Sequence, residues 1–430
     1  MARRYFGTDG IRGVVGDDLT TELVERIGRA ATLWAATSAK SEEGSDPGRV
    51  LVGRDTRGSG PELEAALARG IVSAGGTAVL AGVLPTPAVA LLTEDLGVVV
   101  SASHNPPEYN GVKLFDREGR KLVDDEEEAV EALLDAPGSG GGSVERVEGF
   151  GEMYLRHVLE RFGSDLSGLR VAVDCANGAF SSLAPAAFGD LGAEVHPIGD
   201  DPDGSNINVG CGATDLSALQ RTVTRLGLDV GVAFDGDGDR MLAVDERGEP
   251  LDGDQILAIL ALSLGVDLVA VTVMSNLGFH RLMAEHDVEV VTTPVGDRYV
   301  LEALHRDGGL LGGEQSGHVV WLGDHVAGDG LAAALLLCGA LRGRTLSEAA
   351  AVMPRYPQAK QDVRVARKEI PQSILDEADR LSEELGDRGR VLVRTSGTEP
   401  VVRVLAEAET EEEAASISAT IAALVARELG

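Results

Sequence analysis

Three segments of the chain repeat one pattern of apolar and polar positions. Each begins with a run of β-branched residues, passes through a polar or glycine-containing turn into a stretch of helical periodicity, and ends in a second apolar run; they span residues 49–82, 169–199 and 268–296. Such runs fit strands that are covered on both faces, and the middle sections fit amphipathic helices. The repetition predicts three related α/β domains with mixed sheets, although the segments share pattern more than identical residues.

The last part of the chain follows a different pattern. Residues 390–407 predict two strands around a polar loop, and a helix is expected to follow as far as Leu429, which together make a smaller α+β unit. Residues 136–143 are rich in glycine and serine and predict a linker, residues 353–360 predict another break, and residues 38–48 predict a surface loop. We therefore expect four domains, at residues 1–148, 149–246, 247–360 and 361–430.

The net charge of the chain limits the kinds of molecule that it can bind. The chain has 70 acidic and 38 basic side chains, a formal charge of −32, which opposes binding to nucleic acid or to an anionic membrane. Only five of the 38 are lysines. An acidic surface that prefers arginine to lysine is typical of a protein kept soluble in concentrated salt, so we expect a halophilic source.

Cysteine usage and hydropathy indicate the compartment. Cys175, Cys211 and Cys338 are far apart and form no CxxC pair, so neither a disulfide framework nor a structural zinc site is predicted. The first residues contain no apolar signal core, and the longest apolar stretches, at 256–266 and 331–341, are shorter than the roughly 20 residues that span a bilayer. A soluble, cytoplasmic protein is expected.

The stretch FDGDGDR (234–240) gives the strongest chemical signal. Asp235, Asp237 and Asp239 alternate with glycines between two apolar runs, and three carboxylates this close repel one another unless a cation lies among them. We expect Mg²⁺; a solvated acidic turn and a calcium loop are the alternatives. An EF-hand would match these positions and Glu246, but Arg240 stands where that loop needs glycine, and the flanks predict strands instead of helices.

Two further loops carry groups that bind phosphate or sugar. RTSGTEP (394–400) offers hydroxyls, backbone N–H groups and Arg394, with Arg403 on the next strand. GGEQSGH (312–318) places Glu314 and Ser316 where they could hold sugar hydroxyls, and His318 where it could move a proton. Either loop alone could be an ordinary polar turn. In so acidic a chain, however, cations beside polar loops suggest an anionic ligand, and these are Arg12, Lys113, Arg240, Arg298, Arg394 and Arg403.

Ser103 follows an apolar run in VVVSASHNPPEYNGVK (98–113) and could be a nucleophile or part of a turn. The chain has no GxSxG elbow, and the adjacent His104 is not expected to reach the serine oxygen as a triad base would. It also lacks the GxxxxGK[ST] loop of nucleotide-dependent kinases. A serine at a strand end, a divalent metal and gathered cations are the parts that phosphoryl transfer requires.

Five motifs in order resemble the α-D-phosphohexomutase superfamily over essentially the whole chain. They are FGTDGIRG (6–13), SASHNP (101–106), DGDGDR (235–240), GGEQSGH (312–318) and RTSGTEP (394–400). The resemblance implies three related α/β domains and a fourth that resembles the TATA-binding-protein fold, arranged around a central cleft. It also implies a soluble enzyme for a small hexose phosphate, with a hexose 1,6-bisphosphate as activator or intermediate. A homodimer is the candidate assembly.

The resemblance assigns roles to the motif residues. It implies a phosphoserine at Ser103, with Mg²⁺ bound by Asp235, Asp237, Asp239 and a phosphoserine oxygen. Arg12, Lys113 and Arg240 match positions near the transferred group, and His318 is a candidate for proton transfer. Glu314 and Ser316 match a pair that contacts the sugar. The clamp for the distal phosphate matches Arg394, Ser396, Gly397, Thr398 and Arg403.

Finer motifs bear on the sugar. ASHNP, EQSGH, VGDRYVLE (295–302) and residues 202–215 resemble the members that interconvert glucosamine 6-phosphate and glucosamine 1-phosphate, whereas the lead-in TTPVGDR departs from them. A mutase of mannose or glucose phosphates is the alternative activity. An alternative of another class is a sugar-phosphate sensor that has lost catalysis.

Overall fold

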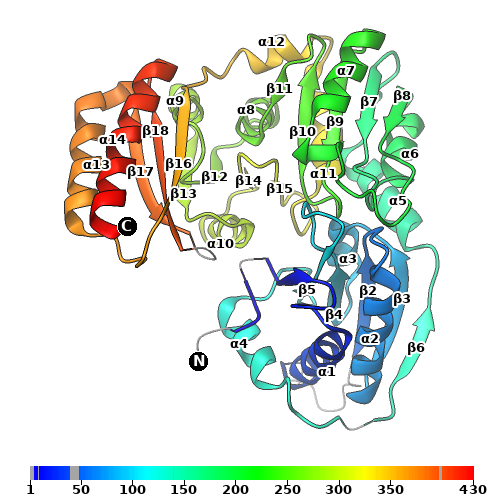
Figure 1. Cartoon of the computed structure of the whole chain (residues 1–430). Coiled ribbons are helices and arrows are strands. Elements are labelled where there is room, and N and C mark those ends of the chain that lie inside the picture. The colour runs from blue at the N-terminus through cyan, green and yellow to red at the C-terminus, as the bar shows by residue number, and fades with distance from the viewer. Residues whose placement is uncertain (1–3, 8, 39–47, 139, 397–399) are drawn as a thin grey trace. The chain divides into compact units, whose positions relative to one another are not determined.

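A computed structural model describes residues 4–7, 9–38, 48–138, 140–396 and 400–430. The chain divides into two compact units, one made of residues 1–273 and 290–351 and the other of residues 274–289 and 352–430. The first unit contains three mixed sheets and the second contains an antiparallel sheet, each with its helices (Figure 1). No helix among the described residues is long and apolar enough to cross a bilayer.

The first sheet has six strands in the order β1-β5-β4-β2-β3-β6. Strands β2, β3, β4 and β6 pair in parallel, and β5 pairs antiparallel with β4 and β1. The strands are β1 (Ile11–Val14), β2 (Arg49–Arg54), β3 (Thr77–Val83), β4 (Leu96–Val100), β5 (Tyr109–Phe115) and β6 (Ser143–Arg146). The helices are α1 (Thr21–Ser38), α2 (Gly60–Ser73), α3 (Thr86–Leu92) and α4 (Asp124–Ala132).

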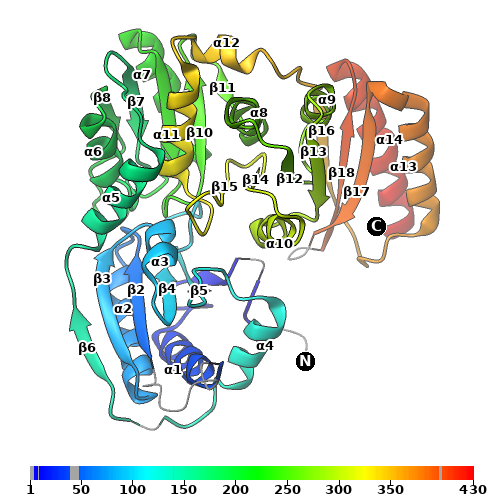
Figure 2. The same ribbon diagram turned by 180° about the vertical axis from the view of Figure 1, so that it is seen from behind.

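Alternation along the strands explains why helices cover both faces of this sheet. Val50, Val52, Val98 and Val100 share one buried cluster with apolar residues of α1 and α2. On the opposite face, α3 approaches so closely that a Cβ at Gly53 would lie 2.5 Å from Val89. Strand β4, which Figure 2 shows inside this sheet, is therefore buried on both sides, as its unbroken apolar run predicts. Ser103 follows just beyond its carboxyl end.

The second sheet has the order β11-β10-β9-β7-β8 and is also mixed. Its core strands β7 and β9 run parallel, and β10 turns back antiparallel beside β9. The strands are β7 (Arg170–Asp174), β8 (Glu194–Ile198), β9 (Val230–Phe234), β10 (Met241–Asp245) and β11 (Pro250–Leu251). The helices are α5 (Phe150–Phe162), α6 (Leu183–Asp190), the 3₁₀ turn η1 (Gly212–Thr214) and α7 (Ser217–Leu226).

The third sheet has the order β13-β12-β14-β15. Its strands are β12 (Leu268–Thr272), β13 (Glu289–Thr293), β14 (Leu311–Gly313) and β15 (Val319–Trp321), and its helices are α8 (Gly253–Leu264), α10 (Asp297–Asp307), α11 (Gly330–Leu341) and α12 (Leu346–Ala350). Asp252 caps the N-terminus of α8, and its carboxylate accepts the N–H of Gln255 at 3.1 Å. The apolar stretches at 256–266 and 331–341 fall in α8 and α11, which are mostly buried helices of this unit.

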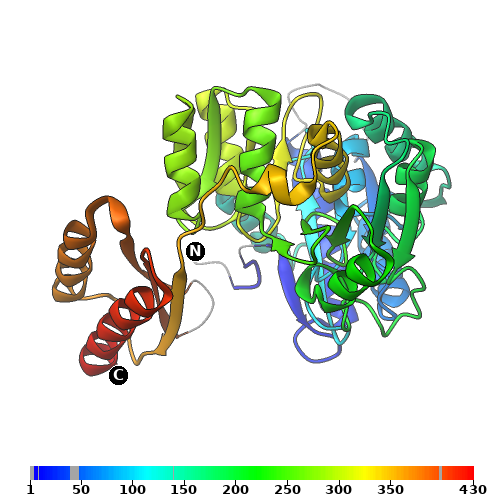
Figure 3. The same ribbon diagram turned by 90° about the horizontal axis from the view of Figure 1, so that it is seen from above.

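The second unit contains α9 (Leu277–Glu285) and an antiparallel sheet of order β16-β18-β17. Its strands are β16 (Gln358–Arg364), β17 (Arg390–Thr395) and β18 (Val401–Glu407), and its other helices are α13 (Gln372–Leu385), the 3₁₀ turn η2 (Gly386–Arg388) and α14 (Glu411–Leu429). Helices α13 and α14 cover the same face of the sheet, where Val402 and Val404 meet Ile374 and Ile421 (Figure 3). Arg394 and Arg403 therefore point to the other face.

The fold class predicted from the pattern is confirmed. Each of the three repeats forms a strand, a helix and a second strand in that order, and the expected C-terminal strand pair and helix are present as β17, β18 and α14. The three boundaries between the four expected domains stay predictions. The surface loop predicted at residues 38–48 lies almost wholly outside the described residues.

Candidate active site

The three aspartates of the FDGDGDR stretch converge in the loop between β9 and β10. Asp235, Asp237 and Asp239 are buried, and each offers a carboxylate oxygen within 4.8 Å of the others. Among the described residues, the Oδ1 atoms of Asp237 and Asp239 are buried without a hydrogen-bond partner. The flanking strands exclude the helix–loop–helix of an EF-hand, so the expectation of strands on both sides is correct.

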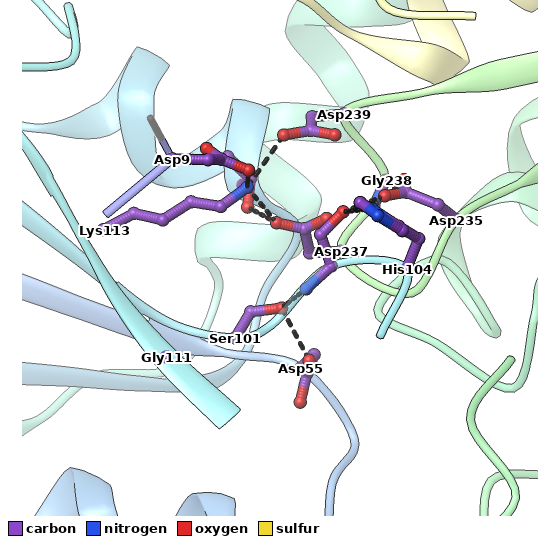
Figure 4. Close-up of polar contacts among 12 residues, drawn as sticks. Asp9, Asp55, Ser101, His104, Gly111, Lys113, Asp235, Asp237, Gly238 and Asp239 are labelled. Atoms are coloured by element: carbon purple, nitrogen blue, oxygen red, sulfur yellow. Dashed lines mark hydrogen bonds and ion pairs between the residues drawn. The ribbon is translucent and has the colours of Figure 1, made fainter. Parts of the chain in front are cut away.

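Lys113 reaches this cluster from β5 (Figure 4). Its Nζ lies 2.7 Å from Asp237 Oδ2 and 2.9 Å from Asp239 Oδ2, and the side chain is buried. Burial lowers the pKa of Lys113, but Asp237 and Asp239 outweigh it and hold that pKa well above its usual value. The ammonium group is therefore a permanent positive charge beside the carboxylates.

Ser103 lies against the same cluster, just beyond the end of β4. Its side chain is buried, its backbone φ is +51°, and its Oγ donates a hydrogen bond of 2.5 Å to Asp235 Oδ2. Residues 235–239, the candidate metal-binding loop (the metal loop below), pack directly on the serine. A Cβ at Gly236 would lie only 2.7 Å from the Ser103 carbonyl oxygen. Burial, followed by the charges of Asp237 and Asp239, raises the pKa of Asp235 well above its usual value.

His104 corrects one expectation. Its Nδ1 lies 3.2 Å from Ser103 Oγ, so the prediction that the adjacent histidine cannot reach the serine oxygen is wrong. The left-handed backbone of Ser103 turns the chain so that neighbouring side chains come together. Burial, then Arg240 and Arg12, lowers the pKa of His104 to about 4, which leaves the imidazole neutral at pH 7.

Two arginines add positive charge around Ser103 and the aspartates. Arg12, on β1, forms an ion pair with Asp9, and Arg240 follows the metal loop with its Nε 3.8 Å from Asp239 Oδ1. In the described part of the chain, the Nε atoms of both arginines are buried without a hydrogen-bond partner. Donors of this kind suit an anionic group such as a phosphate.

The EQSGH segment connects β14 to β15 and faces the same cluster. Ser316 Oγ donates to Glu314 Oε2 at 3.3 Å, and the N–H of Gly296 donates to Glu314 Oε1 at 3.0 Å. His318 is buried with its Nδ1 3.8 Å from Asp239 Oδ1. Burial lowers the pKa of His318, but Asp239 and Asp297 outweigh it and raise that pKa above its usual value.

Sequence reasoning missed three charged members of this cluster. Lys121 Nζ lies 2.6 Å from Asp9 Oδ1 and pairs with Asp297, and His318 Nε2 lies 3.5 Å from Asp297 Oδ2. Asp9 lies in the FGTDGIRG motif, Asp297 lies in VGDRYVLE, and Lys121 is one of the five lysines, so each carried a weak signal. Their alternating charges link the serine side of the cluster to the EQSGH side.

Arg298 is placed differently from the other predicted cations of the first unit. Its guanidinium pairs with Asp124 and lies 3.8 Å from Glu127 Oε2, both on α4, and it stacks over the Tyr299 ring at 5.0 Å. These partners of the guanidinium include neither the aspartates of residues 235–239 nor Ser103 nor the EQSGH segment.

The predicted distal phosphate loop lies in the second unit, between β17 and β18. Arg394 and Arg403 are directly opposite each other in the strand register and line a cavity of about 320 Å³ together with Lys360 and Asp362. Ser396 is buried, and its N–H donates to the Val401 carbonyl at 3.0 Å. Gly397 and Thr398, which were also predicted here, lie outside the described residues.

Family models match four consecutive parts of the chain. The models for phosphoglucomutase/phosphomannomutase α/β/α domains I, II and III match residues 3–139, 152–248 and 252–356, and the model for the C-terminal domain matches residues 359–424. Together they cover most of the chain and account for the three related sheets and the distinct last unit.

Individual relatives agree over the full length. A phosphoglucosamine mutase of Acidothermus cellulolyticus is 49% identical over 99% of this chain and 96% of its own length. A solved phosphoglucomutase/phosphomannomutase family protein of Burkholderia thailandensis has a TM-score of 0.85 at 27% identity, covering 99% of this chain and 98% of its own. The structure of N-acetylphosphoglucosamine mutase of Aspergillus fumigatus in complex with GlcNAc-6P and magnesium has a TM-score of 0.72 and covers 99% of this chain and 96% of its own. Its identity is 21%, so this likeness shows the fold alone. Because the phosphoglucosamine mutase of Acidothermus cellulolyticus is 49% identical over essentially the full length, the chain belongs to the phosphoglucosamine mutase family of the α-D-phosphohexomutase superfamily. It is an isomerase of the phosphohexomutase type.

Proposed function

We propose that the chain interconverts glucosamine 6-phosphate and glucosamine 1-phosphate through a phosphorylated Ser103. The observation that carries the proposal is the position of Ser103 Oγ, 2.5 Å from Asp235 Oδ2 in a buried cluster. In the described structure, Asp237 and Asp239 of this cluster each keep one carboxylate oxygen without a hydrogen-bond partner. The choice of sugar is supported by relatives named phosphoglucosamine mutase that are between 43% and 49% identical.

The aspartate cluster fits a divalent cation. Asp235, Asp237 and Asp239, together with an oxygen of phosphorylated Ser103, would hold Mg²⁺, which prefers hard oxygen ligands. The two carboxylate oxygens without a hydrogen-bond partner favour this assignment, because a buried acceptor that makes no hydrogen bond is costly. When bound, Mg²⁺ supplies positive charge that stabilises the negative charge developing on a transferred phosphoryl group.

The transfer itself balances without another co-substrate. The bond between Ser103 Oγ and phosphorus breaks as the free hydroxyl oxygen of the sugar monophosphate bonds to phosphorus. The sugar hydroxyl loses its proton and the serine oxygen regains one to become a hydroxyl, with His318 as the candidate for proton transfer. The bisphosphorylated sugar then reorients, and its other phosphate returns to Ser103. A hexose 1,6-bisphosphate would prime the serine, and Arg12, Lys113 and Arg240 would neutralise the moving group.

The rest of the substrate would be held by the two polar loops. Glu314 and Ser316 are already oriented by each other and by the Gly296 N–H, which suits them to hold sugar hydroxyls. The distal phosphate would bind Arg394, Ser396, Gly397, Thr398 and Arg403. Arg298 is a further candidate for substrate contact, for which it would have to leave its ion pair with Asp124.

The experiment is a comparison of hexose phosphates under one set of conditions. Purified protein is incubated with Mg²⁺, a trace of the matching 1,6-bisphosphate, and the 6-phosphate of glucosamine, mannose or glucose in turn, and kcat/KM is measured for each. We expect glucosamine 6-phosphate to give the highest kcat/KM. A much higher value with mannose or glucose phosphate would replace the substrate, and no turnover of any of them would favour the sensor.

Three wider properties accompany this proposal. We infer a cytoplasmic enzyme that acts on free sugar phosphates, with a homodimer as its candidate assembly. The formal charge of −32 supports a requirement for salt, because dense like charges repel one another in dilute buffer. Activity and sedimentation measured from dilute to molar salt test the salt requirement and the homodimer.

A further inference from the structure

Arg57 is fully buried and contacts the segment of residues 101–110, which carries Ser103 and is called the Ser103 loop below. It follows β2, and all five of its guanidinium N–H positions have acceptors. Nε donates to Asp55 Oδ2 at 2.9 Å, Nη1 donates to the carbonyls of Pro106 and Tyr109 at 2.5 and 3.0 Å, and Nη2 donates to those of Ser103 and Asn105 at 2.9 and 2.8 Å. One side chain therefore gathers four carbonyl groups of the segment that carries the nucleophile.

A second set of contacts fixes the N–H side of Ser103. Ser101 Oγ accepts the Ser103 N–H at 2.8 Å and donates to Asp55 Oδ2 at 2.6 Å, and Figure 4 shows the contact between Ser101 and Asp55. The same oxygen of Asp55 pairs with Arg57. Both backbone groups of Ser103 are thus tied to the Asp55–Arg57 pair. This matters because Ser103 adopts a φ of +51°, which residues with a side chain rarely adopt.

The second sheet's domain adds donors to the same carbonyls. Asn208 Nδ2 donates to the carbonyl of Ser103 at 2.9 Å and to that of Asn105 at 3.3 Å. The Ser103 carbonyl therefore accepts from both Arg57 and Asn208, which come from different α/β domains. The donors converge on the carbonyls, while Oγ donates to Asp235 Oδ2.

We propose that Arg57 is the positioning residue for the nucleophile: it holds the strained Ser103 loop so that Oγ faces the aspartate cluster. Only a planar guanidinium with five donors can serve four carbonyls and a carboxylate together, so lysine is not equivalent here. The inference rests on the proposed function, because it assigns Arg57 a part in phosphoryl transfer by Ser103. Arg57 touches no reacting atom and acts through the loop.

The test compares Arg57→Lys with Arg49→Lys, a matched change at the start of β2, the strand that Arg57 follows, at a side chain that is 45% exposed. For each, kcat and KM with glucosamine 6-phosphate and hydrogen exchange of the amides of residues 101–110 are measured. A displacement of the nucleophile by about 1 Å can cost about 100-fold in rate. We therefore expect Arg57→Lys to lower kcat by roughly that factor with KM within about twofold of the wild type, and to speed exchange of the Ser103 amide. Arg49→Lys should leave kcat, KM and the exchange of the Ser103 amide unchanged.

A second variant covers the case in which Arg57→Lys does not fold, as judged by circular dichroism. Asn208→Ala removes one donor to the Ser103 carbonyl and leaves Arg57 in place, and we expect kcat to fall by about tenfold at unchanged KM. Unchanged kcat and unchanged exchange in the folded variants would overturn the inference while the proposed function stands. If the wild type turns over no hexose phosphate, the proposed function fails, and the exchange of the Ser103 amide still decides whether Arg57 holds the loop.

Discussion

Removing the ammonium group of Lys113 should expose how much the aspartate cluster depends on a cation. In Lys113→Met the buried stem is kept, but Asp237 and Asp239 lose a partner at 2.7 and 2.9 Å. Breaking a buried ion pair typically costs about 3–5 kcal/mol, because the remaining charge is left uncompensated. At about 2–4 °C per kcal/mol for a domain of some 150–250 residues, the melting temperature without Mg²⁺ should fall by roughly 10 °C.

The assay is thermal unfolding followed by circular dichroism, with and without Mg²⁺. The matched control is Arg69→Met, which breaks an exposed pair with Glu25 at 2.9 Å and should cost less than about 1 kcal/mol. Mg²⁺ should stabilise Lys113→Met more than the wild type, because carboxylates without an ammonium neighbour bind the cation more strongly. A melting temperature for Lys113→Met that matches Arg69→Met in the absence of Mg²⁺ would refute the reasoning.

Two other changes probe the surroundings of the metal loop and the second sheet. Thr86 Oγ1 donates a hydrogen bond to Asp237 Oδ2 at 2.6 Å. Thr86→Val should therefore weaken Mg²⁺ binding by about 10–100-fold in a calorimetric titration. An unchanged affinity would show that this hydrogen bond does not orient the Asp237 carboxylate. Burial raises the pKa of Asp174 to about 6 from an ordinary 3.8, so the folded state binds its proton more tightly than the unfolded chain. Ionisation of Asp174 therefore lowers the free energy of unfolding of the wild type as the pH rises through about 4 to 6. In urea unfolding, the stability of Asp174→Asn relative to the wild type should increase by about 2 kcal/mol between about pH 4.5 and about pH 7.5. A stability difference that does not change with pH would contradict the raised pKa.

The sequence pattern predicted the parts of the fold and site that depend on local chemistry. Strand β4 is an unbroken apolar run, and the aspartates of residues 235–239 alternate with glycines, so both could be recognised within a few positions. The flanking strands of the metal loop followed from the same local pattern. These features need no knowledge of how distant segments pack.

The features that sequence reasoning missed are made by distant segments. Arg57 meets carbonyls 46 to 52 positions further along the chain, and Thr86 meets Asp237 across 151 positions, so no local spacing announces either contact. The distance between His104 and Ser103 depended on the positive φ of Ser103, which the contacts of Arg57 and Ser101 stabilise from outside the turn. Tertiary contacts, and not residue type, decided these cases.

The central claim is that Ser103 carries the phosphoryl group, and peptide mass spectrometry tests it most directly. The protein is incubated with Mg²⁺ and a hexose 1,6-bisphosphate, digested, and compared with a sample chased with glucosamine 6-phosphate; Ser103→Ala serves as the control. The account predicts one phosphoryl group on Ser103, its transfer to the sugar in the chase, and none in Ser103→Ala, which should also lose turnover by several orders of magnitude. Turnover of glucosamine 6-phosphate by an enzyme that never carries phosphate on Ser103 would contradict it.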